Sequence, residues 1–322
     1  MAISQSARRA PRRRGPAGGS GLGSPSRLRQ PSRRRRQTLV AWMFCLPFVA
    51  VFATFMLMPI GGSLAMSFTD ITSRDLQTPF AVGFVGLDQY LSLLGDQRFL
   101  TSLAVTGLFV LIGIPITIGF ALALAVGLNT GRGRIVTILR VGYYAPAVTS
   151  IVAISVAWKY ILQPDGLLNA ALGLVGIPGV NWLNDPVWAL PSLIMLAVWR
   201  NVGTLMVIFL AGLQSIPKDL LEAATMDGAG AWRRFFGVTL PMLRPTILLG
   251  AVLISVGYLQ FFEEAFVMTG GGPLDRTLSV AFYTYQQFGV GQYGRASAAS
   301  YILFLLVALL SLLQFRLLRR KD

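Results

Sequence analysis

The chain has 322 residues, of which 54% are hydrophobic and only 13% charged, and its formal net charge at pH 7 is +15. A soluble domain has about twice that charged fraction, so the composition predicts a polytopic membrane protein. Because there is no His and only one Cys, the sequence excludes intrachain disulfides, His-based metal sites and Cys/His nucleophile pairs.

Residues 1–37 contain eleven Arg and no acid, so this segment alone contributes +11. Pro, Gly and Ser separate the Arg clusters, which predicts a disordered cytoplasmic tail. A nucleic-acid arm is disfavoured because no aromatic residue stands among the Arg. A twin-Arg export signal at Arg33 to Arg36 is disfavoured because the following apolar run can span a membrane and lacks a clean cleavage site. We interpret the tail as a topogenic segment that contacts membrane lipid and no nucleic acid.

Six apolar segments follow, and together they form a predicted transmembrane domain over 38–322. At ~1.5 Å per residue, each is long enough to cross a hydrocarbon core of ~30 Å as a helix. The predicted spans are 39–60, 102–128, 138–161, 190–212, 246–268 and 297–318.

Basic residues are concentrated in the tail and in the connections on the same side of the membrane as the tail, which hold 22 of the 28 Lys and Arg. Seven acids lie in the opposite connections, so both termini are predicted to be cytoplasmic. The outer connections are short and polar, and the aromatic residues near them are expected to be interfacial anchors. These are Trp158, Tyr160, Trp182 and Trp188.

A polar cytoplasmic loop over 214–245 separates the fourth and fifth predicted spans. Lys218 to Asp227 contains no helix breaker and is followed by Gly228, which predicts a short helix that ends there. A second short helix should follow and should end at Pro241 and Pro245.

The loop contains EAA, three residues, G, nine residues, V, one residue, and LP. These positions are Glu222, Ala223, Ala224, Gly228, Val238, Leu240 and Pro241. With Val238 at the position where Ile is usual, this spacing resembles the ATPase-docking loop of ABC importer permeases. Further stretches resemble the carbohydrate branch of that family, which includes maltose, lactose and glycerol-phosphate permeases: FVGLDQYLSLL from Phe84, PDGLLN from Pro164, FLAGLQSIPKDLLEAA from Phe209 and MTGGGP from Met268. The resemblance covers roughly 39–318.

The resemblance implies an all-α, type I importer permease with six transmembrane helices and a cytoplasmic coupling helix, in the cell membrane of a prokaryote. It implies a heterodimer with a second permease subunit, two ATPase subunits and an extracytoplasmic solute-binding protein. The residues it assigns to ATPase coupling are Glu222, Ala223, Ala224, Asp227, Gly228, Leu240 and Pro241. Small Ala side chains permit close approach of a partner, and the two acids offer acceptors to a basic surface.

The chain contains no GxxxxGK[ST] phosphate loop, and none of its three Lys stands in that setting. We therefore expect no catalytic residue, no metal and no cofactor in this chain, and ATP with Mg on the partner ATPase. The expected role is that of a transport subunit and not of an enzyme.

Charged and amide residues inside the predicted spans are candidates for the translocation path, because an ionised group there must face protein or water. The candidates are Arg200, Asn201, Gln260 and Glu263. Two interpretations stay open: these groups exchange hydrogen bonds with sugar hydroxyls, or Arg200 pairs with Glu263 or with the partner subunit. Glu263 stands where the family often has Asp, whereas Glu264 departs from the usual apolar residue.

The alternative function is an ion-coupled secondary carrier for a small solute, which would need internal pseudo-symmetry and a relay of intramembrane acids. A membrane anchor or receptor is a further alternative. Gly270, Gly271 and Gly272 before Pro273 form either part of an outer gate, as the resemblance implies, or a plain helix stop. The sequence does not identify the solute, the paired subunits or the role of the tail.

Overall fold

The structure is a computed structural model that describes residues 31–77, 82–131 and 133–318, and this part of the chain is mostly helical. It divides into two units, residues 1–58 and 59–322, which are described separately. Besides the helices described below, it contains the 3-10 turn Ser73–Gln77, an isolated bridge between Thr69 and Phe84, and the helices α2 (Met58–Met66), α3 (Asp88–Leu94), α7 (Leu167–Leu174), α12 (Glu263–Met268), α13 (Val280–Gly289) and α14 (Tyr293–Leu318).

The first unit contains α1 (Pro31–Phe52) and the π-helical turn Ala53–Leu57. Residues 31–37 are helical, where the sequence predicted a disordered tail up to residue 37. Proline suits the first turn of a helix and Arg has a good helix propensity, so the helix can begin at Pro31, before the apolar run. The rest of the predicted tail, residues 1–30, lies outside the described residues.

Within the described residues, five helices are long and apolar enough to cross a membrane, in agreement with the predicted all-α membrane fold. They are Val40–Met66, Gln97–Asn129, Ala189–Gln214, Ala231–Leu259 and Tyr293–Arg316. The predicted third span, 138–161, is a pair of helices, α5 (Arg134–Val148) and α6 (Ile151–Ile161), bent by 103°. The number of spans is six only if this bent pair is counted as one.

The prediction of a single helix over 138–161 was wrong because the backbone leaves the helical region at Thr149 and Ser150. The hydroxyl of Thr149 donates to the carbonyl of Ala145 at 3.0 Å, and Pro146 supplies no amide hydrogen to the last turn. Local side-chain bonds of this kind compete with helix continuation.

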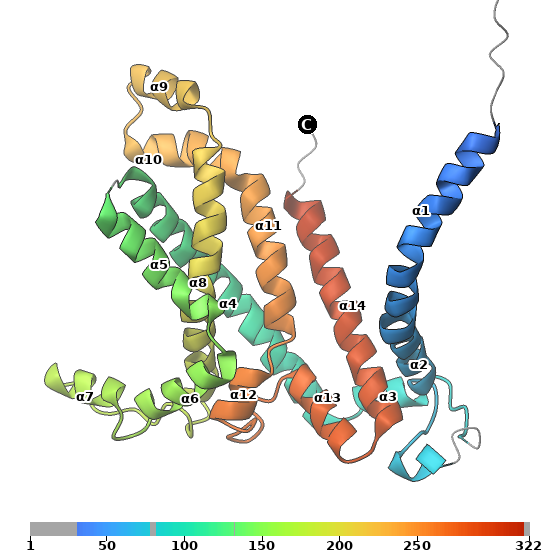
Figure 1. Cartoon of the computed structure of the whole chain (residues 1–322). Coiled ribbons are helices and arrows are strands. Elements are labelled where there is room, and N and C mark those ends of the chain that lie inside the picture. The colour runs from blue at the N-terminus through green and yellow to red at the C-terminus, as the bar shows by residue number, and fades with distance from the viewer. Residues whose placement is uncertain (1–30, 78–81, 132, 319–322) are drawn as a thin grey trace, which may run out of the picture. The chain divides into compact units, whose positions relative to one another are not determined.

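Helix α8 (Ala189–Gln214) is the centre of the second unit (Figure 1). It packs against α4 (Gln97–Thr130), α5 and α11 (Leu240–Leu259). Its most deeply buried side chains are Leu193, Leu196, Ala197, Leu205, Met206 and Phe209. Because lipid tails are as apolar as these side chains, close van der Waals packing must stabilise the bundle.

Glycines let the helices around α8 approach closely. A Cβ atom at Gly203 would collide with the carbonyl oxygen of Tyr143 on α5. A Cβ at Gly212 would lie 2.7 Å from Oγ1 of Thr246 on α11. Both glycines lie on α8, so the close contacts extend along two sides of this helix.

The fifth predicted span, 246–268, differs at both ends from the helix in the structure, which covers Ala231–Leu259. The short helix α10 (Ala231–Arg234), the π-helical turn Phe235–Thr239 and α11 are continuous, so the prediction that Pro241 and Pro245 end the helix was wrong. Pro241 lies in the first turn of α11, and the wider π turn before it accommodates a missing amide hydrogen. At the other end α11 stops at Leu259, and α12 is a separate helix.

A group of charged and hydroxyl side chains joins α4, α13 and α14. Asp96 caps α4 by accepting from the Arg98 amide at 2.8 Å, and it accepts from the Tyr283 hydroxyl at 2.7 Å. Arg295 on α14 forms an ion pair with the same carboxylate. Burial acts to raise the pKa of Asp96, but these hydrogen bonds and the Arg295 charge outweigh it and hold the pKa below its usual value. Burial, with Asp96 as the acceptor, raises the pKa of Tyr283 to about 12.

Figure 1 shows α9 (Lys218–Met226), α10 and the C-terminal end of α14 at one end of the second unit. Helices α7, α12 and α13 lie at the other end. The connections that the sequence assigned to opposite sides of the membrane are therefore separated in space.

We predict that Gly203→Ala destabilises the protein by about 1–3 kcal/mol, because overpacking forces α5 and α8 apart. The control is Gly119→Ala on α4, where an added Cβ meets no atom within 4 Å. The measurement is the thermal unfolding of both purified variants. Equal stability of the Gly203 variant and the wild type would contradict the close-packing role.

We predict that Asp96→Asn costs about 1–3 kcal/mol at neutral pH, because it removes the negative charge and one of the two oxygens that accept the hydrogen bonds from Arg98 and Tyr283. A lowered folded-state pKa stabilises the protein above the unfolded-state pKa of ~3.9, and this contribution is lost as the pH falls through the folded-state value. The stability difference from the wild type should therefore be constant near neutrality and shrink in acid. Asp88→Asn at the start of α3 is the exposed control, and a pH-independent difference for Asp96→Asn would refute the assignment.

Candidate functional site

Helix α9 forms where the sequence predicted a short helix. It covers Lys218–Met226, follows Pro217, and ends before Gly228, whose φ of 77° is a conformation that glycine adopts readily. The amide of Gly228 donates to the carbonyl of Thr225 at 3.0 Å, and the amide of Ala229 donates to the carbonyl of Ala224 at 3.0 Å. These bonds satisfy carbonyls that a helix end otherwise leaves unpaired.

None of the residues of α9 is buried. Glu222, Ala223 and Asp227 are exposed, and Ala224 is partly buried. Beside them stand exposed apolar side chains, including Met226 at 88% and Trp232 at 77% of their maximal area. A nine-residue helix is marginal on its own, so this surface is suited to a docking partner.

Few contacts hold α9 to the bundle. Leu221 packs against the core, and the Arg234 guanidinium donates to the Thr225 hydroxyl at 2.8 Å. The remaining motif residues, Leu240 and Pro241, lie on α11. The motif therefore spans two elements: its first part forms the exposed helix, and its last part begins a membrane helix.

The four predicted path residues lie on three elements. Arg200 and Asn201 are on α8, Gln260 follows the last residue of α11, and Glu263 begins α12. Gln260 and Glu263 are exposed, whereas Arg200 and Asn201 are partly buried. The break after α11 thus separates Glu263 from the helix on which the sequence analysis placed it.

Glu264, and not Glu263, is the buried acid, with 7% of its area exposed. Burial dominates the environment of its carboxyl group, the charge of Arg200 has a smaller opposing effect, and the two side chains, both among the described residues, form no ion pair within 4.0 Å. The ion pair between Arg200 and Glu263 that the sequence left open does not form within 4.0 Å in the described structure, and Nε of Arg200 is buried without a hydrogen-bond partner there.

Two further polar residues complete this cluster and were missed by the sequence analysis. The hydroxyls of Tyr258 on α11 and Thr117 on α4 share a hydrogen bond of 2.7 Å, and the Asn201 amide lies beside Tyr258. Both hydroxyl residues stand inside apolar runs, so their sequence context alone did not distinguish them from ordinary core residues.

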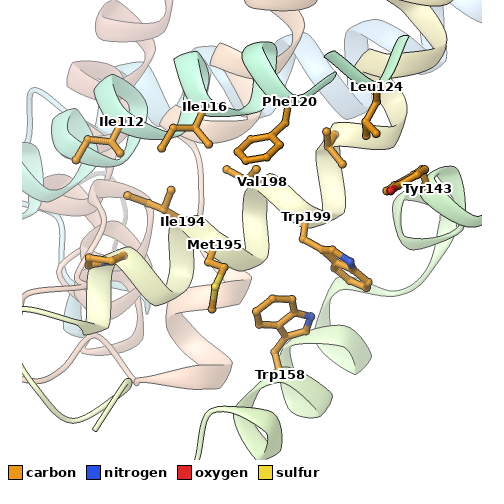
Figure 2. A pocket seen from close by; sticks show the side chains of 12 residues that line it. Ile112, Ile116, Phe120, Leu124, Tyr143, Trp158, Ile194, Met195, Val198 and Trp199 are labelled. Carbon is orange, nitrogen blue, oxygen red and sulfur yellow. The ribbon is translucent and has the colours of Figure 1, made fainter. Parts of the chain in front are cut away.

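A pocket beside α8 is apolar and is not lined by any of the four path candidates. It has a volume of about 670 Å³ and lies between α4, α5, α6 and α8. Figure 2 shows the rings of Trp158 and Trp199 at its edge, and their centroids are 5.5 Å apart. Trp158 thus contributes to this pocket in addition to any interfacial role. The lining has too few hydrogen-bonding groups to bind a sugar.

Asn169 organises the connection between α6 and α8. Its amide nitrogen donates to the carbonyl of Val180 at 2.8 Å, and its amide oxygen accepts from the Val180 amide and from the Trp182 indole. This residue ends the PDGLLN stretch, but the sequence did not reveal its role, since its partners lie eleven and thirteen residues later.

Residues 116–322 match the family described as binding-protein-dependent transport system inner membrane component. The chain is 39% identical over 288 residues to a probable ABC transporter permease protein of Bacillus subtilis, covering 88% of this chain and 91% of the relative. It is 36% identical to the lactose transport system permease protein LacF of Rhizobium radiobacter, and the match covers 90% of this chain and 98% of LacF. A crystal structure of a bacterial ABC transporter involved in import of the acidic polysaccharide alginate contains a chain of similar fold, with a TM-score of 0.74 and 25% sequence identity. The match covers 89% of this chain and 98% of that chain.

We predict that Arg200 and Glu264 are energetically coupled in a double-mutant cycle. Arg200→Gln and Glu264→Gln should each destabilise the protein, and the double variant should cost less than their sum by about 0.5–3 kcal/mol. Glu263→Gln, one residue away and exposed, is the matched control and should show no coupling to Arg200. The measurement is thermal unfolding of the purified variants, and additive effects for Arg200 and Glu264 would disprove the coupling.

Proposed function

Because this chain belongs to the family of binding-protein-dependent transport system inner membrane components, we propose that it is the permease subunit of an ATP-driven sugar importer. The similarity to a lactose permease over nearly the full length of both chains supports a sugar as solute. The chain is a multi-pass membrane protein, and the alternative of an ion-coupled carrier is not favoured.

The proposed assembly contains a second permease subunit, two ATPase subunits and an extracytoplasmic solute-binding protein. The sequence has no phosphate loop, so ATP and Mg bind to the ATPase in this proposal. The lysine and arginine distribution supports cytoplasmic termini in a prokaryotic cell membrane, and the grouping of α9 with the C-terminal end of α14 agrees with it.

One observation carries the proposal: α9 is a short helix with no buried residue that bears the EAA spacing and projects from one end of the bundle. Closure of the ATPase pair would move α9. Three residues, Ser215 to Pro217, join α9 to α8, so little slack separates this helix from the centre of the bundle. On its other side, Leu240 and Pro241 would pass the movement to α11. We infer that this is how nucleotide binding switches the bundle between inward-open and outward-open states.

The translocation path in this proposal runs along the polar cluster of α8, α11 and α12. Gln260 and Glu263 are exposed in the single chain and would face the second permease subunit. Arg200 and Asn201 lie deeper and would contact the sugar through hydrogen bonds exchanged during its passage. Glu264 positions Arg200 through its charge.

We predict that Glu222→Lys abolishes most sugar uptake while leaving ATP hydrolysis by the assembled complex measurable, because a reversed charge blocks the docking of α9. Asp165→Lys, a charge reversal on an exposed outer residue, is the control and should leave uptake within about twofold of wild type. Uptake of labelled mono- and disaccharides is measured in cells, with membrane insertion of each variant verified. Normal uptake by the Glu222 variant would reject the coupling role of α9.

A further inference from the structure

A polar cavity of about 500 Å³ lies beside α9, at the end of the bundle opposite the outer loops. It is formed by the turn between α4 and α5, the end of α8 and the start of α9. Its polar lining comprises Asn129, Thr137, Arg140, Gln214 and Lys218, and its apolar lining comprises Val136, Leu213, Ile216 and Leu221. The cavity therefore joins three parts of the chain that are distant in sequence.

The described residues that line this cavity include two cations and no acid. Arg140 donates from Nη2 to the carbonyl of Leu128 at 2.9 Å, which fixes its guanidinium against the last turn of α4. Its Nε is buried and has no hydrogen-bond partner among the described residues. Lys218 is exposed at the first position of α9. Two uncompensated positive charges around one cavity attract an anion.

We propose that this cavity binds a phosphate group. A guanidinium held in place offers several N–H donors in the planar geometry that suits phosphate oxygens, and a lysine adds a second charge. The amides of Asn129 and Gln214 supply neutral donors, and the Thr137 hydroxyl, which makes a long 3.4 Å bond to the Gly133 carbonyl, can rotate to supply another. The volume accommodates a phosphate together with a small organic group, so the phosphate can belong to a soluble metabolite or to a lipid headgroup.

Occupation of the cavity restrains α9. Because this helix buries none of its own residues, an anion held between Arg140 on α5 and Lys218 on α9 adds a link between α9 and the bundle. This consequence rests on the proposed coupling role of α9, whereas anion binding itself does not. The site is thus suited to slow transport when a phosphorylated compound accumulates.

The test is binding of inorganic phosphate to the purified, assembled complex, measured as the phosphate-dependent shift in unfolding temperature at constant ionic strength. Arg140→Gln should weaken binding at least about tenfold, in line with loss of a charged hydrogen bond. Arg134→Gln removes the same charge from an exposed position on α5 outside the cavity and should bind like the wild type. No binding by the wild type, or equal weakening by both variants, would overturn the proposal.

A second variant guards against misfolding, since Arg140 also caps α4. Thr137→Val keeps the shape of the side chain and removes one donor, so it should weaken binding about fivefold with little change in stability in the absence of phosphate. Wild-type affinity in this variant, together with an unstable Arg140 variant, would count against the site.

The source of the phosphate is distinguished by repeating the titration with glucose 6-phosphate in detergent and in phosphatidylglycerol nanodiscs. Equal binding in both supports a soluble ligand, and loss of binding only in the nanodiscs supports a lipid headgroup that already occupies the cavity. Because binding is measured without sugar uptake, a failure of the sugar-importer proposal would leave these results interpretable.

Discussion

The close approach of α8 to its neighbours is the constraint on which the second unit depends. At Gly203 and Gly212 the adjoining helices lie so near that a side chain larger than hydrogen would collide with a backbone carbonyl or a threonine. Helices packed at this distance cannot slide past one another gradually, because interdigitated interiors resist small deformations. A displacement at one end of α8 is therefore transmitted as a rigid-body movement, which is the property that a permease driven from outside the membrane needs.

The bundle also determines how charge is tolerated inside it. Arg200 and Glu264 lie in an otherwise apolar interior, Glu264 buried and Arg200 partly buried, where an isolated charge would be costly. The hydroxyl pair of Tyr258 and Thr117 lies in the same region, so α4, α8, α11 and α12 all contribute polar groups there. This concentration of polar groups in an otherwise apolar interior is a local departure from the best packing, and such departures are expected where a protein handles a polar solute.

The helix-breaking residues around it predicted α9 to within one residue. In a polar loop such local signals decide the helix ends, because little tertiary packing acts against them. The same reasoning was wrong for residues 138–161, where an apolar stretch contains a right-angled break at Thr149 and Ser150. It was also wrong at Pro241, which directly follows a π turn, and at Pro245, which lies inside α11. The buried acid could not be assigned either. Which of Glu263 and Glu264 faces the interior depends on the break after Gln260, and that break is a feature of tertiary packing.

The division of the EAA motif between two elements explains why its spacing is long. Glu222, Ala223 and Ala224 lie on α9, which has no buried residue, whereas Leu240 and Pro241 lie on α11, part of a helix long and apolar enough to cross a membrane. Between them, Gly228 ends α9 with a φ of 77°, and the π turn Phe235–Thr239 continues α10 into α11. Under the proposed coupling role, a movement of α9 reaches α11 through this connection.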